Sequence, residues 1–266
     1  MIELKSPLIG EGYITHVTGT KGAGKTTLIG DMLYTEMDKG PCAYLFTRRE
    51  GNQHGGGWTV LPRKVREGCR LIFLENLGDL DTLFKEWRKK PLQGLGIDTS
   101  TGVELLIRSK VTGDDLLDLR TKTGDNQYKR FDNMLAYYLQ SFRDVSKYTM
   151  MVSPAIPTSY NPEKATTDTG MSGTSIDADK RFGPESETNK SKQKLLYLSD
   201  YCFHINQEEH PASGKIKSRV LMMQPSLKLM TASRVTLGKS MNNITLEPEW
   251  GVNWVKVKGE IEGAID

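Results

Sequence analysis

Residues 19–26 read Gly-Thr-Lys-Gly-Ala-Gly-Lys-Thr, which fits the pattern G-x-x-x-x-G-K-S/T at every fixed position. The β-branched and aromatic run Tyr13–Thr18 before it is typical of a strand, and apolar residues recur at helical spacing from Lys25 to Met37. Glycines let the backbone curl so that successive N–H groups point inward, and the helix start adds the positive end of its dipole. The order strand, loop, helix therefore predicts a phosphate-binding loop; the alternative is a glycine-rich turn with a chance Lys-Thr pair.

Each residue type in such a loop has a defined task. The lysine reaches the β- and γ-phosphates of a nucleoside triphosphate, and the next hydroxyl completes the shell of a Mg²⁺ ion. We therefore expect Lys25 to contact phosphate and Thr26 to bind the metal, with ATP and Mg²⁺ as cofactors. The residues expected to hold the nucleotide are Gly19, Thr20, Lys21, Gly22, Ala23, Gly24, Lys25, Thr26 and Thr27.

Length and composition are those of a globular α/β protein. The chain has 266 residues, of which 37% are hydrophobic and 26% charged. This length is enough for one large domain with its own core, which we favour, or for one domain plus a small appendage. No apolar stretch approaches the roughly 18–20 residues of a membrane helix, and Met1–Lys5 lacks the order of a signal peptide. We expect a cytoplasmic protein without a membrane partner. The net charge of +3 is too mild to indicate nucleic-acid binding by itself.

Cysteine and histidine usage argues against a zinc site. Cys42, Cys69 and Cys202 are far apart, and each lies in or beside an apolar run, so we expect buried thiols. The histidines show no metal-ligand spacing.

A second part of the site is expected at Asp98, which ends the short apolar run that begins at Pro91. In nucleotide-binding proteins an aspartate at the tip of a core strand also holds Mg²⁺, usually through water. We therefore predict that Asp98 is a metal ligand; the alternative is that it only begins a turn or caps the helix expected near residues 103–107. Gly94 and Gly96 lower the strand propensity of this run.

The rest of the chain alternates between expected strands and helices, which predicts an α/β fold with a mostly parallel central sheet flanked by helices. Ser153 follows an expected strand and is either a γ-phosphate sensor or a turn serine. From Ile244 to Val257 polar and apolar residues alternate, so the chain is expected to end in antiparallel β structure. Further strands are expected at residues 41–47, 70–74, 148–152, 201–206 and 220–224, and helices at 79–90 and 131–145.

Residues 155–192 change composition toward proline, glycine, serine, threonine and charge, which is typical of a long mobile loop. Basic residues such as Lys180 and Arg181 are interspersed with Tyr160 and Phe182. This combination suits contact with single-stranded DNA, because charge follows the phosphates and rings stack on bases. Acidic residues offset the charge, so a solvated linker remains the alternative.

On these motifs the chain resembles single-domain RecA-like P-loop ATPases, and more narrowly the phage-encoded nucleotide-binding proteins that act in single-strand annealing recombination. The resemblance covers residues 10–225 and is carried by Gly19–Thr27, by Glu50 at a strand end, by Gly96–Ser100 and by a late basic β-hairpin. It implies a RecA-like P-loop NTPase fold and, if the chain is phage-encoded, a location in the host cytoplasm.

The resemblance also implies a catalytic base. RecA-like sites take the water-activating glutamate from the strand after the first helix, and Glu50 is the matching residue here. Thr99 follows Asp98 where the AAA+ branch has a catalytic glutamate, which speaks against that branch. Glu75 and Glu104 are the reserve candidates.

A further cation arrives from the neighbouring subunit in RecA-like assemblies, and Lys228 and Arg234 resemble that position. Arg219 is a weaker option, and ordinary surface charge is the alternative for all of them. Such a cation implies a homo-oligomeric ring or filament around single-stranded DNA. The expected organisation is a RecA-like core over residues 1–225 and a β extension over 226–266 packed on it.

Three classes of function are compatible with these motifs. The first is a DNA-stimulated ATPase of the recombination or annealing type. The second is a small-molecule or nucleoside kinase, for which residues 155–192 would be the lid. The third is a nucleotide-dependent switch or packaging-type motor; a GTPase is disfavoured because no guanine-reading N-K-x-D string occurs.

Overall fold

A computed structural model describes residues 13–47, 56–113, 125–159, 180–184, 189–209, 216–224, 232–233 and 239–265. The strands are β1 (Tyr13–Gly19), β2 (Cys42–Thr47), β3 (Arg70–Leu74), β4 (Leu92–Asp98), β5 (Ser146–Ser159), β6 (Lys180–Pro184), β7 (Tyr201–Glu209), β8 (Ile216–Met222), β9 (Ala232–Ser233) and β10 (Ile244–Thr245). The helices are α1 (Lys25–Glu36), a 3-10 turn η1 (Gly56–Val60), α2 (Arg63–Gly68), α3 (Leu77–Lys89), α4 (Ser100–Thr112), α5 (Asp125–Val145), α6 (Asn189–Leu198) and α7 (Asn253–Ile265).

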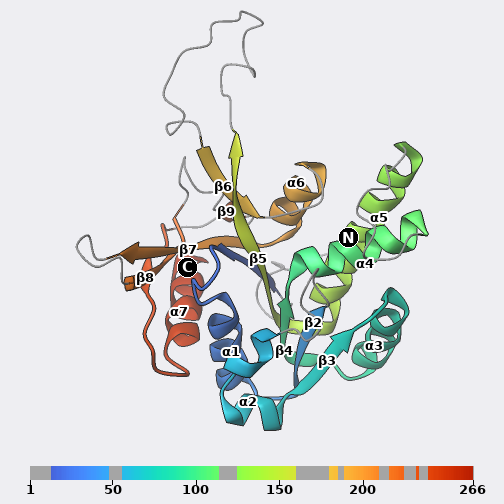
Figure 1. Cartoon of the computed structure of the whole chain (residues 1–266). Coiled ribbons are helices and arrows are strands. Elements are labelled where there is room, and N and C mark those ends of the chain that lie inside the picture. The colour runs from blue at the N-terminus through green and yellow to red at the C-terminus, as the bar shows by residue number, and fades with distance from the viewer. Residues whose placement is uncertain are drawn as a thin grey trace, which may run out of the picture.

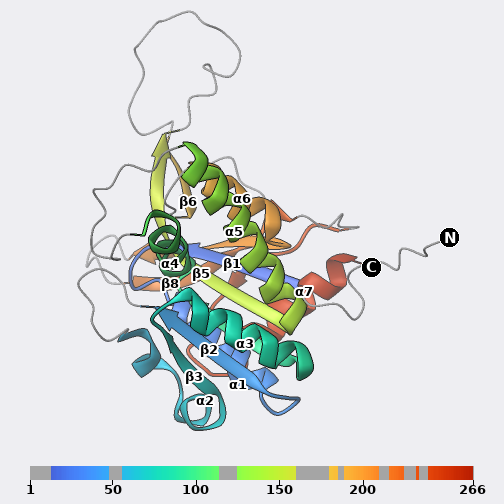
Figure 2. The same cartoon turned by 90° about the vertical axis from the view of Figure 1, so that its right-hand side faces the viewer.

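The described strands form one ten-stranded sheet in the order β10-β8-β7-β1-β5-β4-β2-β3, with β6 paired to β5 and β9 to β7. The strands from β7 to β3 in this order pair in parallel, whereas β8, β9, β10 and β6 pair antiparallel. Helices cover both faces of the sheet (Figures 1 and 2). The predicted α/β architecture, with its mostly parallel sheet and antiparallel strands toward the C-terminus, is confirmed.

Parallel pairing brings the functional segments to one edge of the sheet. Thr18 of β1 lies opposite Ser153 of β5, and Asp98 of β4 lies opposite both Val152 of β5 and Phe46 of β2. The carboxyl ends of β1, β2 and β4 therefore meet beside Ser153 of β5, where the loop after β1 begins. In open α/β sheets ligands bind at this edge.

Two apolar cores hold the layers together, one on each face of the sheet. The first contains Val17 of β1, Ile29 of α1 and Trp254 of α7, and the second contains Leu95 of β4 and Phe142 of α5. Each of these side chains is at least 99% buried, and full burial of one such side chain is worth about 1.5–3 kcal/mol. Within the described residues, none of the helices combines the length and apolar character needed to cross a bilayer.

The glycines of β4 are explained by close packing. A Cβ placed on Gly96 would collide with Ile29 Cγ2 of α1 and would lie 3.2 Å from Cδ2 of Tyr44. A Cβ on Gly94 would lie 3.1 Å from Cys42 Sγ. The absence of a side chain at Gly96 leaves room for α1 to pack close to the sheet and for the Tyr44 ring to lie against β4. This close packing offsets the lower strand propensity of the glycines.

The structure differs from the loop expected over residues 155–192. β5 runs on through residues 155–159, which pair antiparallel with β6, and this ribbon rises away from the rest of the sheet (Figures 1 and 2). Composition misled here because a two-stranded ribbon satisfies its backbone groups by pairing and needs little apolar surface. Residues 160–179 and 185–188 lie outside the described part of the chain.

The end of the chain is also different from expectation. The interpretation of β structure as far as Val257 is wrong after β10, because residues from Asn253 onward form helix α7. Trp254, Val257 and Ile261 are buried against the first core at three- and four-residue spacing, which is the period of a helix. The alternation that includes Trp250 matched a strand over too short a window to distinguish the two periods.

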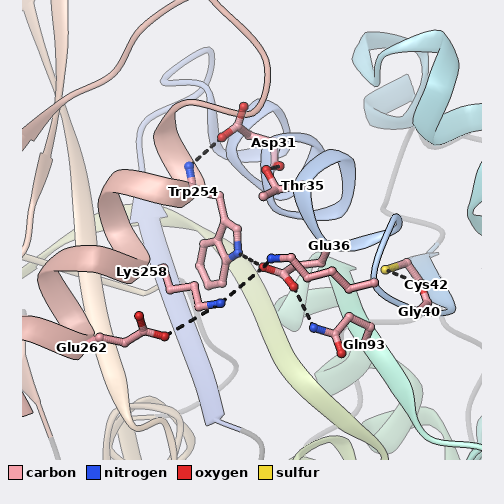
Figure 3. A network of polar contacts seen from close by, with 10 residues as sticks. Asp31, Thr35, Glu36, Gly40, Cys42, Gln93, Trp254, Lys258 and Glu262 are labelled. Carbon is pink, nitrogen blue, oxygen red and sulfur yellow. Dashed lines mark hydrogen bonds and ion pairs between the residues drawn. The ribbon is translucent and has the colours of Figure 1, made fainter.

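Helix α7 is fastened to α1, the helix that follows the glycine loop (Figure 3). The Asp31 carboxylate accepts hydrogen bonds from the backbone N–H groups of Gly251 and Trp254, at the start of α7. Glu36 of α1 accepts a hydrogen bond from Trp254 Nε1 at 3.0 Å. The C-terminal helix thus packs directly on the helix that carries Lys25.

Candidate phosphate-binding site

The loop between β1 and α1 has the backbone of an anion cradle. Gly22 and Gly24 have φ angles of +79° and +97°, a left-handed conformation that glycine adopts without steric cost. Gly24 is the N-cap residue of α1 and offers no side chain to cap the helix, and its carbonyl accepts the first helical bond from Leu28 at 2.9 Å. The first amides of α1 have no partner one turn earlier in the helix, so they face outward and attract anions.

Lys25 lies folded over this loop. Its Nζ donates hydrogen bonds to the carbonyl oxygens of Gly19 and Thr20, each at 2.7 Å. These two hydrogen bonds hold the ammonium group at the mouth of the loop. A phosphate oxygen is a stronger acceptor for an ammonium group than a carbonyl, so the same side chain is placed to bind phosphate.

The loop is joined to the tip of β4 through one carboxylate oxygen. Thr26 Oγ1 donates to Asp98 Oδ2 at 2.7 Å, and the hydroxyl of Tyr44 on β2 donates to the same oxygen at 2.9 Å. Burial, and then the charge of Asp98, raises the pKa of Tyr44 far above its ordinary value, so the phenol stays a donor. The alternative that Asp98 caps the next helix does not hold, because Thr99 caps α4 by accepting from the Gly102 amide.

This corner fits the requirements of Mg²⁺ rather than those of a protein-enclosed metal. Thr26 and Asp98 offer hard oxygen ligands side by side. Within the described residues, no three or more histidine, cysteine or acidic side chains gather as a metal site. Mg²⁺ commonly takes one or two protein oxygens and completes its octahedron with water and phosphate oxygens. Thr26 and Asp98 are the residues that would hold it.

Two further residues contribute to this corner that the sequence does not predict. Tyr44 gave no signal because an aromatic residue in a strand is ordinarily part of the core. Gly57 of η1 approaches so closely that a Cβ there would lie 2.9 Å from Asp98 Oδ2 and 3.2 Å from the Tyr44 hydroxyl. The glycine run that includes Gly57 was a signal for such an approach, since only glycine lets backbone come this near to a polar cluster.

A cleft of about 840 Å³ opens over the loop. Its size is within the range of small-molecule sites. Among the described residues that line it, Asp98 is the only acidic one, whereas Lys21 and Lys25 carry positive charge. The remaining lining residues are Gly22, Gly24, Thr26, Thr27, Tyr44, Phe46, Thr47, Gly57, Val60, Thr99 and Pro154. The charge balance favours an anionic ligand.

The other residues expected to be catalytic do not line this cleft or lie outside the described part of the chain. Glu50, Lys228 and Arg234 lie outside the described residues, and their roles stay predictions. Glu75 is exposed at the end of the edge strand β3, and Glu104 is fully buried on α4. Neither reserve glutamate lines the cleft.

Ser153 takes part in a buried polar cluster beneath the loop. Its Oγ lies 2.9 Å from His16 Nε2, which joins β5 to β1. Thr18 Oγ1 lies 2.9 Å from His204 Nδ1 on β7. Burial lowers the pKa of His16 to about 4, and burial together with the charge of Lys25 lowers the pKa of His204 to about 4. Both imidazoles are neutral near pH 7, and a sensor role for Ser153 stays a prediction.

Comparisons with known proteins add a likeness in fold. No protein-family model and no curated protein sequence matches the chain. Among solved structures, it is similar to a KaiC-like protein from the hyperthermophilic archaeon Pyrococcus horikoshii, with a TM-score of 0.48 and 12% sequence identity. The alignment covers 91% of this chain and 88% of that chain. At this level of likeness, function has to be inferred from the chain's own residues.

Proposed function

We propose that the chain is a Mg²⁺-dependent ATPase with a RecA-like core. The observation that carries the proposal is the contact between Thr26 and Asp98, which joins a complete phosphate-loop motif to an acidic strand tip at 2.7 Å. A glycine-rich turn that matched the motif by chance would not be expected to combine left-handed glycines with a hydrogen bond from Thr26 to Asp98. The cleft above the loop has the size and the positive lining that a nucleotide requires.

The chemistry proposed for the site is positioning and charge neutralisation. The amides at the start of α1 and the Lys25 ammonium bind the phosphate oxygens and stabilise the charge that develops during transfer. A Mg²⁺ ion held by Thr26 and Asp98 supplies further positive charge to the phosphates. Glu50 is proposed to orient the attacking water.

Single-stranded DNA and a second copy of the chain are the proposed partners, in a recombination or annealing reaction of the phage type. Two features support the DNA part: the resemblance of the motifs, and the presence of Lys180 and Arg181 in the β5–β6 ribbon. A ring or filament would place cations such as Lys228 and Arg234 beside the nucleotide of the neighbouring subunit.

The test is Mg²⁺-dependent binding of a fluorescent ATP analogue, followed by phosphate release with and without single-stranded DNA. Lys25→Ala should lower turnover by at least about a hundredfold, because a lost phosphate-directed cation removes several kcal/mol of transition-state stabilisation. Lys85→Ala, which removes an exposed charge on α3 outside the cleft, is the matched control.

The outcomes separate the parts of the proposal. A folded protein that takes up no ATP in the presence of Mg²⁺ would overturn the whole proposal. Turnover that DNA does not accelerate would remove the DNA partner and leave the ATPase. A Glu50→Gln variant that binds ATP and hydrolyses it at the parental rate would exclude Glu50 as the base.

A further inference from the structure

The hairpin of β7 and β8 passes beside the phosphate loop of its own chain. Ile205 of β7 pairs in parallel with Gly19, the first residue of the loop motif. Two residues further along β7 comes Gln207, which lies opposite Arg219 of β8 in the antiparallel register. Residues directly opposite in such a pair project to the same face of the sheet. Gln207 and Arg219 are therefore carried together to the loop.

Gln207 fixes one end of this arrangement. Its Oε1 accepts a hydrogen bond from Thr20 Oγ1 at 2.9 Å. A Cβ placed on Gly22 would lie 4.0 Å from Gln207 Nε2, so the amide rests against the turn of the loop. The hairpin is thus tied to the loop by a polar contact and by van der Waals packing.

Arg219 reaches the other end of the loop. A Cβ placed on Gly24 would lie 3.4 Å from Arg219 Cδ and 3.8 Å from its Nε. The arginine stem therefore rests on the residue that caps α1, and its guanidinium is held next to the helix start. This is the end of the helix that attracts anions.

The charge of Arg219 is not balanced within the described part of the chain. No carboxylate there forms an ion pair with it, and the residue is exposed. A cation beside the positive end of a helix dipole is electrostatically unfavourable. An anion bound between the Arg219 guanidinium and the start of α1 would be attracted to both and would relieve their mutual repulsion. This arrangement is therefore suited to bind an anion.

We propose that Arg219 binds the phosphates of the nucleotide held by its own chain, with Gln207 as the positioning residue that fixes the hairpin on the loop. The proposal rests on the proposed function, since it needs a nucleotide in the cleft. It differs from the expectation for Lys228 and Arg234, which would act on a neighbouring subunit. It also changes the role expected for Arg219, from a weak candidate between subunits to a cation supplied within one.

The first test is binding of Mg²⁺·ATP to Arg219→Ala. A hydrogen-bonded charge pair with phosphate predicts a rise in Kd of about tenfold or more. Arg219→Lys should recover only part of this, because lysine keeps the charge and loses the bidentate geometry. Lys217→Ala, which removes the same charge from the same exposed strand, is the matched control and should bind normally. A thermal melt verifies that each variant is folded.

The second test separates action within a chain from action between chains. Lys25→Ala protein keeps Arg219, and Arg219→Ala protein keeps Lys25, so a mixture of the two restores ATPase sites only if the arginine acts across an interface. We expect the mixture to show no more activity than the two proteins measured separately. Restored activity in the mixture would overturn the proposal.

The failure of this inference is distinguishable from the failure of the proposed function. Absence of Mg²⁺-dependent ATP binding in the parental protein contradicts the ATPase itself. Parental protein that binds ATP, together with Arg219→Ala protein that binds it equally well, contradicts only the role of Arg219.

Discussion

The buried Glu36 carboxylate should be among the most stabilising polar groups of the chain. Its side chain has no exposed surface, and it joins α1 to β4 and α7 (Figure 3). Gln93 Nε2 donates to Oε2 at 2.7 Å, and Trp254 Nε1 donates to Oε1 at 3.0 Å. Lys39 at 3.0 Å and Lys258 at 3.8 Å supply the compensating charge.

Replacement of Glu36 by alanine leaves its partners without an acceptor. Trp254 is 1% exposed, so its indole N–H cannot form a hydrogen bond with water instead. Lys39 and Lys258 are partly exposed, so their ammonium groups can be solvated. Loss of one member of a buried charge network costs about 3–5 kcal/mol. At about 2–4 °C per kcal/mol for a domain of this size, Glu36→Ala should melt about 6–20 °C lower than the parental protein.

The assay is thermal and urea unfolding followed by circular dichroism. Glu262→Ala is the control, because Glu262 is exposed and lies 3.8 Å from the same Lys258. Its loss should change the free energy of unfolding by less than about 1 kcal/mol. If Glu36→Ala were as stable as Glu262→Ala, the network would not hold α7 on α1 and the reasoning would be refuted.

The contribution of Glu36 also has a pH dependence of known sign. Burial raises the pKa of the Glu36 carboxyl, but the hydrogen bonds from Gln93, Trp254 and Lys39 outweigh it and leave the pKa below the ordinary value of 4.5. A depressed pKa in the folded state stabilises the protein above the unfolded pKa, and this gain is lost as the pH falls through the folded value. The advantage of the parental protein over Glu36→Gln should therefore shrink below about pH 4.5.

Three further substitutions test the site and the packing beneath it. Gly96→Ala inserts a methyl group against Ile29 and should cost about 1–3 kcal/mol in urea unfolding, whereas parental stability would contradict the close packing. Asp98→Asn removes the carboxylate charge beside Thr26 and should raise the Mg²⁺ concentration needed for ATP binding by about tenfold or more; an unchanged Mg²⁺ titration would exclude Asp98 from the metal site. Tyr44→Phe removes a buried donor to Asp98 and should lower the free energy of unfolding by about 1–3 kcal/mol, which a melt of equal midpoint would disprove.

The elements around the loop could be predicted because their signals are local. The pattern from Gly19 to Thr26 requires contiguous residues, and the flanking strand and helix have clear periods of their own. The position of Asp98 could also be predicted from the sequence. In a chain that alternates strands and helices, a carboxylate at the end of an apolar strand lies at the carboxyl edge of the sheet. These predictions needed no knowledge of strand order.

The errors arose where the deciding interaction is made by a distant partner. The start of helix α7 is capped by Asp31 of α1, whose carboxylate accepts a hydrogen bond from the Trp254 amide at 2.6 Å. Residues 244–257 do not contain that carboxylate, so their local alternation by itself predicts a strand. The β5–β6 ribbon was missed for a related reason, because backbone pairing leaves little trace in side-chain composition.

The residues that complete the site depend on register in the same way. Tyr44 reaches Asp98 because β2 lies next to β4 and Gly96 leaves the space between them. Arg219 reaches the loop because β7 pairs with β1 and β8 pairs with β7. A shift of one residue in the register of any of these three strand pairs would turn the side chains concerned to the opposite face of the sheet. The loop motif fixes where the proposed phosphate site lies, whereas strand register decides which further donors and cations lie beside the loop.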